Sequence, residues 1–331
     1  MIYQTLGQTG LQVSRMGFGC APLGNEYGDI GNDEAIRAVH VAIENGINFF
    51  DTSPYYGRTL SESRLGEALK GKRHRVILAT KGGRFDRSLE TGFDFAYDGI
   101  IGMCEASLRR LQTDYLDVYQ LHDIEFGDKD QVVHVAIPAI QKLKADGKVR
   151  FIGVTGYPLP LLREMVETQS LDVTLSYCHY NLMNTTLNDV LVPAVKARGV
   201  GLINGSVTHM GLLTDQGPQP WHPAPARVKD VAAAVAAYCR SRGISLPHLA
   251  IQFALQNPDV DVTLLGTRTV KELEESLRLL ESEPDAGLLA AVQRIIEPVA
   301  NATWPSGRPE HFEPGAASVG VQQPGANPGG L

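Results

Sequence analysis

"NFFDTSPYYG", residues 48–57, begins as an apolar run and stops at a carboxylate, a proline and two adjacent tyrosines. The apolar part is typical of a short strand buried on both faces, as in a parallel sheet covered by helices. Polar residues that follow such a strand lie at its carboxyl end, where α/β enzymes bind their ligands. The stretch therefore predicts a buried strand that brings Asp51, Tyr55 and Tyr56 to a functional rim.

The same arrangement recurs along the chain, where eight short apolar runs alternate with amphipathic windows such as residues 33–46. The runs are "RMGFGC" (15–20), "INFFDTS" (47–53), "RVILATK" (75–81), "LDVYQLH" (116–122), "RFIGVTG" (150–156), "DVTLSYC" (172–178), "VGLINGS" (200–206) and "DVTLLGT" (261–267). A doubly wound sheet would also fit strand-helix alternation. Eight evenly spaced units of one composition favour a closed (β/α)8 TIM barrel, an α/β fold, which we expect as a single domain over residues 1–300.

Three segments lie outside these eight units. Residues 1–14 carry a "GQTG" turn between short alternating runs and predict an N-terminal β-hairpin at the bottom of the barrel. Two additional helices are expected over 246–258 and 285–300. Residues 301–331 end in a Gly- and Pro-rich stretch with few apolar anchors, so we expect a C-terminal segment that is partly irregular or mobile.

The composition restricts the class of partner. The net charge of −7 is spread along the chain without a basic block, which argues against nucleic acid or an anionic membrane. No signal peptide or long apolar run is visible, and four widely spaced cysteines form no metal or disulfide pattern. We expect a cytoplasmic monomer or small homo-oligomer without a metal, acting on a small molecule.

Three consecutive predicted strands end in an acid, a base and an imidazole: Asp51, Lys81 and His122. Each has an ordinary alternative, because an aspartate often forms a turn, a lysine is often solvated and a lone histidine is often a core residue. Adjacent strands of one barrel place all three on the same rim. A shared site is therefore the better hypothesis.

The chemistry of this set is proton transfer. Lys81 beside Asp51 stays charged, and its charge favours the anionic form of a nearby phenol, which would lower the pKa of Tyr56. Tyr56 can then donate a proton to a carbonyl oxygen or take one from a hydroxyl, while His122 orients the substrate. The set supplies no hydride, so a hydride cofactor is its natural complement. No GxGxxG motif follows a strand, which leaves the loops at 205–213 and 266–277 as candidate phosphate sites.

From residue 5 to residue 276 the sequence resembles the aldo-keto reductase superfamily, through "FDTSPYYG", "LATK" and "LH". The resemblance implies a (β/α)8 barrel that binds NAD(P) across its top and passes hydride to or from C4 of the nicotinamide. It places the catalytic set on Asp51, Tyr56, Lys81 and His122, with tyrosine as the acid and base.

The resemblance also implies a cofactor site. Its expected residues are Gly19, Cys20, Asp51, Thr155, Tyr177, Ser206, Met210, Gly211, Leu212, Gly266, Thr267, Arg268, Glu272, Glu275 and Ser276. The tyrosine that usually stacks on the nicotinamide corresponds to Gly205, so no stacking residue is assigned. Glu272 stands where NADPH-preferring members have an arginine, and a carboxylate there repels a 2′-phosphate and accepts a ribose hydroxyl. We therefore expect NAD to be preferred over NADP, although one register shift would bring Arg268 to the 2′ position.

Three further segments, residues 92–100, 175–182 and 303–307, resemble the branch of aldose 1-dehydrogenases that act on L-galactose, L-fucose and related sugars. This implies oxidation of the anomeric hydroxyl to a lactone with NAD. The expected substrate residues are Tyr56, Phe93, Tyr97, His122, Asp123 and Trp304, although the aromatic ones equally suit loop anchoring. Pyridoxal 4-dehydrogenase, a general NAD(P)H aldehyde or ketone reductase, and a cofactor-binding regulatory subunit of a channel with incidental turnover remain as alternatives.

Overall fold

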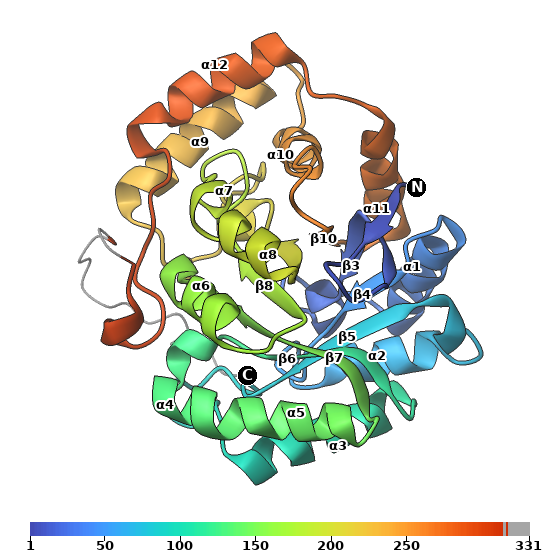
Figure 1. Ribbon diagram of the computed structural model, residues 1–331. Helices are drawn as coiled ribbons and strands as arrows, with labels where there is room; N and C mark the ends of the chain where they lie inside the picture. The colour runs from blue at the N-terminus through green and yellow to red at the C-terminus, as the bar shows by residue number, and fades with distance from the viewer. Residues whose placement is uncertain (314–315, 317–331) are drawn as a thin grey trace.

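The computed structural model describes residues 1–313 and residue 316. Its centre is a closed barrel of eight parallel strands, in which the last strand pairs with the first (Figure 1). The strands, in barrel order, are β3 (Met16–Gly19), β4 (Phe49–Asp51), β5 (Ile77–Gly82), β6 (Leu116–Leu121), β7 (Val149–Gly156), β8 (Val173–Tyr177), β9 (Gly201–Gly205) and β10 (Val262–Gly266). The predicted (β/α)8 barrel is confirmed.

Helices cover the outside of the barrel, because one set of strand side chains points outward and needs an apolar cover. The helices are α1 (Asn32–Glu44), α2 (Leu60–Ala68), α3 (Tyr97–Leu111), α4 (Lys129–Gln131), α5 (Ile137–Ala145), α6 (Leu159–Thr168), α7 (Leu187–Val190), α8 (Val192–Arg198), α9 (Ala226–Arg240), α10 (Leu246–Leu255), α11 (Val270–Arg278) and α12 (Ala286–Ile296). The 3-10 helices are η1 (Ala21–Gly24), η2 (Arg73–Arg75), η3 (Ile124–Phe126), η5 (His209–Gly211), η6 (Leu279–Glu281), η7 (Glu297–Val299) and η8 (Pro309–His311). A π-helical segment, η4 (Val132–Ala136), lies between α4 and α5. Among the described residues, no helix has the length and apolarity to cross a membrane.

The predicted N-terminal hairpin forms from β1 (Tyr3–Thr5) and β2 (Gln12–Ser14), which pair antiparallel. Its side chains Leu6, Leu11 and Val13 join the apolar cluster inside the barrel, which includes Phe49 and Val118. The hairpin therefore closes the amino-terminal end of the barrel and leaves the carboxyl ends of the strands as the face for ligands.

Both helices predicted beyond the eight units form, as α10 and α12. α10 contacts β10 and so belongs to the ring around the barrel. α12 lies outside the ring beside α9, and Val292 and Ile296 of α12 share an apolar cluster with Val228 and Val235 of α9 (Figure 1). The added layer is therefore the α9–α12 pair.

The segment after α12 passes down the side of the barrel near α6 (Figure 1). Over residues 301–313 it is irregular apart from η8, and Trp304 is only 2% exposed. The prediction of mobility for the end of the chain falls on residues 314–331, which lie outside the described residues apart from Ala316.

Candidate active site

The carboxyl ends of β4, β5 and β6 bring the four candidate catalytic side chains together. Asp51 ends β4, Lys81 lies near the end of β5, and His122 directly follows β6. Tyr56 comes from the turn after β4 and places its hydroxyl 3.3 Å from Lys81 Nζ. Neighbouring parallel strands thus supply an acid, a base and an imidazole to one phenol, as the sequence predicted for this rim.

The ion pair between Lys81 and Asp51 lies at the bottom of the site and is buried, with side chains 1% and 2% exposed. Lys81 Nζ also donates to the carbonyl of Thr52 at 2.9 Å, and Gln120 Nε2 donates to the other Asp51 oxygen at 3.1 Å. Burial raises the pKa of Asp51 above its ordinary value, while Lys81 and Gln120 oppose this rise. Both oxygens of Asp51 are engaged, so the ammonium group has a fixed position under Tyr56.

The pKa of Tyr56 differs from the expectation that Lys81 would lower it. Burial is the largest effect and the charge of Asp51 the next, and together they raise the pKa of Tyr56 well above its ordinary value. The expectation was wrong because it counted the lysine and omitted the desolvation of the phenol. At neutral pH the Tyr56 hydroxyl keeps its proton and can donate it.

His122 is a neutral imidazole with a defined hydrogen bond. Its Nδ1 lies 3.0 Å from Ser53 Oγ, which accepts the backbone N–H of Tyr55 at 3.1 Å. Ser53 Oγ can donate its proton to Nδ1 in the tautomer of His122 that carries the imidazole proton on Nε2. Burial lowers the pKa of His122 to about 3, and the charge of Lys81 acts in the same direction. Nε2 can therefore donate a hydrogen bond to a substrate oxygen.

Arg84 is a site residue that the sequence reasoning missed. Its guanidinium forms an ion pair with Asp123 and lies 3.9 Å above the ring of Tyr55. Its position three residues after Lys81, in the loop following β5, was the available signal. Burial opposes ionisation of Asp123, but His122 and Arg84 hold its pKa below the ordinary value. A charged, hydrogen-bonding pair therefore lies beside His122.

The aromatic residues predicted to bind substrate have three different surroundings. Phe93 lies 5.2 Å from the Arg84 guanidinium and stacks on Phe126 at 4.9 Å. It therefore packs beside the Arg84–Asp123 ion pair. Tyr97 is 39% exposed at the first position of α3. Trp304 stacks on Tyr157 at 5.1 Å within an apolar cluster, which favours anchoring of the C-terminal segment.

The residues predicted for the nicotinamide half of the cofactor surround the rim. Gly19 ends β3 and Cys20 follows it. The Cys20 side chain is fully buried with Sγ 3.6 Å from the Phe18 carbonyl, its backbone N–H donates to the Asp51 carbonyl at 2.8 Å and its carbonyl accepts the Ser61 hydroxyl at 2.7 Å, so Cys20 is used to hold the rim. Thr155 is buried and its hydroxyl accepts the backbone N–H of Asp123 at 3.1 Å. Tyr177 ends β8, half-buried. The hydroxyls of Thr155 and Tyr177 are both already used to hold the loop after β6, through Asp123 and Glu125.

The loops after β9 and β10 differ in what they offer a dinucleotide. Ser206, Met210 and Gly211 follow β9 with φ of 55°, 55° and 100°, and the buried Leu212 anchors this loop. Its backbone N–H groups largely donate within the loop, as Gly211 does to the Thr208 carbonyl at 3.1 Å. Within the described part of the chain, the buried Thr267 hydroxyl after β10 has no hydrogen-bond partner. An unsatisfied hydroxyl beside a helix start is a suitable contact for a phosphate group.

The start of α11 is lined by carboxylates. Arg268, which follows Gly266 and Thr267, pairs with Glu272 at 2.8 Å, and Glu34 accepts the backbone N–H of Val270 at 3.0 Å. The remaining predicted cofactor residues have partners of their own: Glu275 lies 3.7 Å from His248, and the Ser276 hydroxyl donates to the Glu272 carbonyl at 2.9 Å. Arg268 is therefore neutralised by the same carboxylate that the sequence singled out.

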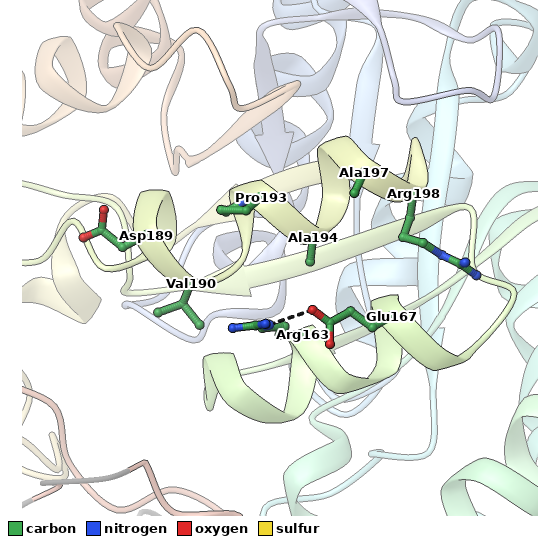
Figure 2. Close-up of a pocket in the computed structure, with 8 residues that line it drawn as sticks. All are labelled: Arg163, Glu167, Asp189, Val190, Pro193, Ala194, Ala197 and Arg198. Atoms are coloured by element: carbon green, nitrogen blue, oxygen red, sulfur yellow. Dashed lines mark hydrogen bonds and ion pairs between the residues drawn. The ribbon is translucent and has the colours of Figure 1, made fainter.

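A shallow hollow lies on the outer wall, between α6 and α7–α8 (Figure 2). It is lined by Arg163, Glu167, Asp189, Val190, Pro193, Ala194, Ala197 and Arg198. Figure 2 shows Arg163 and Glu167 pointing toward one another, and they form an ion pair at 2.7 Å. This hollow is formed by outer helices, so it is separate from the strand-end site.

Comparison with known proteins identifies the family of this chain. Residues 15–297 match the Aldo/keto reductase family. The chain belongs to this family. It is 46% identical to an L-galactose dehydrogenase of Arabidopsis thaliana, over 92% of this chain and 97% of the relative. It is 31% identical to a D-threo-aldose 1-dehydrogenase of a Pseudomonas species, over 85% and 93%. The holo form of an aldo-keto reductase from Bacillus halodurans, AKR11C1, has a TM-score of 0.74 and 28% identity, covering 95% of this chain and all of that one.

Membership of the aldo/keto reductase family confirms the resemblance drawn from the motifs, and the chain is an oxidoreductase of a family that uses nicotinamide cofactors. The four candidate catalytic residues all lie inside the matched range.

Proposed function

We propose that this protein is an NAD-preferring aldose 1-dehydrogenase, which oxidises the anomeric hydroxyl of an L-galactose, L-fucose or L-glucose type sugar to the lactone. The observation that carries the proposal is the Arg84–Asp123 ion pair beside His122. Charged hydrogen-bonding groups next to aromatic rings suit a polyhydroxylated ring, and a simple aldehyde has no use for them. The names of the two relatives, both sugar dehydrogenases, support the same substrate class.

Each of the site residues has a separate role in the proposed reaction. His122 Nε2 and the Tyr56 hydroxyl bind the anomeric oxygen, and Arg84 and Asp123 bind hydroxyls elsewhere on the ring. The loops after β9 and β10 would hold the NAD, which would supply the acceptor for the hydride at C1 of the sugar. Tyr56, after losing its own proton, takes the proton of the anomeric hydroxyl, while Lys81 at 3.3 Å stabilises the phenolate.

A substrate panel tests the proposal directly. Formation of NADH is followed at 340 nm with L-galactose, L-fucose, L-glucose and pyridoxal. Turnover of at least one sugar, faster than pyridoxal, is expected. Turnover of pyridoxal alone would support a pyridoxal 4-dehydrogenase, and reduction of simple aldehydes alone would support a general reductase. Tight cofactor binding without any turnover would support a regulatory subunit and contradict the enzymatic proposal.

Replacing Arg84 with methionine should raise KM for the sugar about tenfold or more, because a charged hydrogen bond is worth about 1.5–3 kcal/mol. Reduction of 4-nitrobenzaldehyde, which has no hydroxyls to bind, should change little. Arg87→Met is the matched control, since the Arg87 side chain is 52% exposed and pairs with Glu26, outside the Arg84–Asp123 pair. Equal losses with the sugar and the aldehyde would show that Arg84 supports the site as a whole and does not select the substrate.

The preference for NAD rests on the carboxylates at the start of α11. Glu272 both neutralises Arg268 and accepts its backbone N–H at 2.8 Å, and Glu34 occupies the N–H of Val270. These groups leave little positive potential for a 2′-phosphate.

Replacing Glu272 with alanine should free the Arg268 guanidinium. The ratio of kcat/KM with NAD to kcat/KM with NADP should then fall about tenfold, a change that corresponds to about 1.4 kcal/mol. Glu274→Ala, on the exposed face of the same helix, is the control. A wild type that already prefers NADP would contradict the proposed cofactor choice.

A further inference from the structure

Glu125 is a fully buried carboxyl group that the proposed reaction does not use. It lies in η3, three residues after His122. Its Oε1 accepts the backbone N–H of Tyr157 at 3.1 Å, the Tyr177 hydroxyl at 3.2 Å and the Ser306 hydroxyl at 3.1 Å. One carboxyl oxygen therefore joins the loop after β6 to the ends of β7 and β8 and to the C-terminal segment.

The main chain of Glu125 makes a second set of bonds with the C-terminal segment. Its carbonyl accepts the backbone N–H of Arg308 at 2.9 Å and faces His311 Nδ1 at 2.7 Å. Gly307 has φ of +84°, and a Cβ atom there would lie 2.3 Å from the Glu125 carbonyl oxygen. Only glycine passes this closely, so the path of the segment is fitted to Glu125.

The same C-terminal segment also reaches the loop predicted to hold the cofactor. Trp304 packs against Tyr157 at 5.1 Å and against His209 at 5.2 Å. His209 belongs to η5, which also contains Met210 and Gly211. The segment therefore connects the loop after β9 with the loop that carries His122 and Asp123.

We propose that Glu125 is a positioning residue for the proposed sugar oxidation: it ties the His122–Asp123 loop to the ends of β7 and β8 and to the C-terminal segment, and so fixes the imidazole and Asp123 relative to Tyr56. The inference rests on the proposed function for its substrate. Small errors of position are costly in catalysis, since about 1 Å of misplacement lowers rates about 100-fold.

The buried position of Glu125 favours the neutral form of its carboxyl group. Burial raises the pKa of Glu125 to about 8, and the charge of Asp123 adds to the rise. The titratable groups that face it are Asp123, Tyr157, Tyr177 and His311. Ionisation would place a second negative charge beside Asp123, whereas the bonds that Tyr157 and Ser306 donate to Oε1 favour the charged form.

The test compares Glu125→Gln, Glu125→Ala and the control Glu310→Gln, an exposed carboxylate of the same segment. Glu125→Gln keeps the shape of the neutral carboxyl and should retain most of kcat. Glu125→Ala should lower kcat about tenfold or more, with a smaller change in the Kd for NAD measured by fluorescence quenching.

Hydrogen-deuterium exchange gives a readout that does not depend on the substrate. Exchange of the peptide covering residues 122–127 should rise in Glu125→Ala and remain as in the wild type in Glu310→Gln. If Glu125→Ala does not fold, Ser306→Ala removes one of the three bonds and should show the same changes on a smaller scale. Wild type without sugar turnover overturns the proposed function. Active wild type with unchanged kcat and unchanged exchange in Glu125→Ala or Ser306→Ala overturns the positioning role.

Discussion

Replacing Tyr56 with phenylalanine should lower kcat for sugar oxidation about 100-fold or more, because the change removes the group that takes the substrate proton. The Kd for NAD should change little, since the hydroxyl faces Lys81 at 3.3 Å and Tyr56 is not among the residues expected to hold the cofactor. Stopped-flow measurement of the first turnover, together with fluorescence titration of NAD, separates chemistry from binding.

The matched control is Tyr55→Phe. Tyr55 lies under the Arg84 guanidinium at 3.9 Å and packs edge-on to His122, so it is a wall of the pocket. A damaging Tyr55→Phe beside a harmless Tyr56→Phe would reverse the two assignments.

The pH dependence of oxidation follows from the state of Tyr56. Because burial raises its pKa, the phenolate form that accepts a proton is scarce at pH 7 and increases as pH rises. kcat/KM for sugar oxidation should therefore increase across pH 7–10, and Tyr56→Phe should lack this increase. A wild-type profile that falls over this range would contradict a tyrosine base.

Replacing Lys81 with methionine should lower the free energy of unfolding by about 3–5 kcal/mol, the typical cost of leaving one partner of a buried ion pair without the other. The Asp51 carboxylate, 2% exposed, would keep only Gln120 as a side-chain partner. Urea denaturation followed by circular dichroism measures the change. Activity should also be lost, since no ammonium would stabilise the phenolate.

Lys148→Met is the control for this stability change. Lys148 pairs with Glu105 on the surface, with side chains 38% and 41% exposed, and such pairs contribute about 1 kcal/mol or less. Equal losses in the two variants would show that the Lys81–Asp51 pair contributes no more to the fold than a surface pair does.

Much of the fold follows from the sequence alone, because its signals are local. Eight apolar runs separated by amphipathic windows specify buried parallel strands, and the GQTG turn specifies the hairpin. The position of a strand end in the chain also decides which rim it reaches, so Asp51, Lys81 and His122 could be predicted to lie together. What periodicity did not reveal is that α10 joins the ring while α9 pairs with α12, since all three helices have an apolar face.

Only the tertiary structure decided the protonation states of these residues and the contacts that hold them in place. The pKa of Tyr56 rises where a count of neighbouring charges predicted a fall, because desolvation depends on every atom packed around the phenol. Arg84 and Glu125 join the site through contacts with residues 39 and 181 positions away in the chain. The sequence determined which groups stand at the rim, since strand ends are set locally. Their protonation and their positions are set by packing between distant segments, which no local pattern encodes.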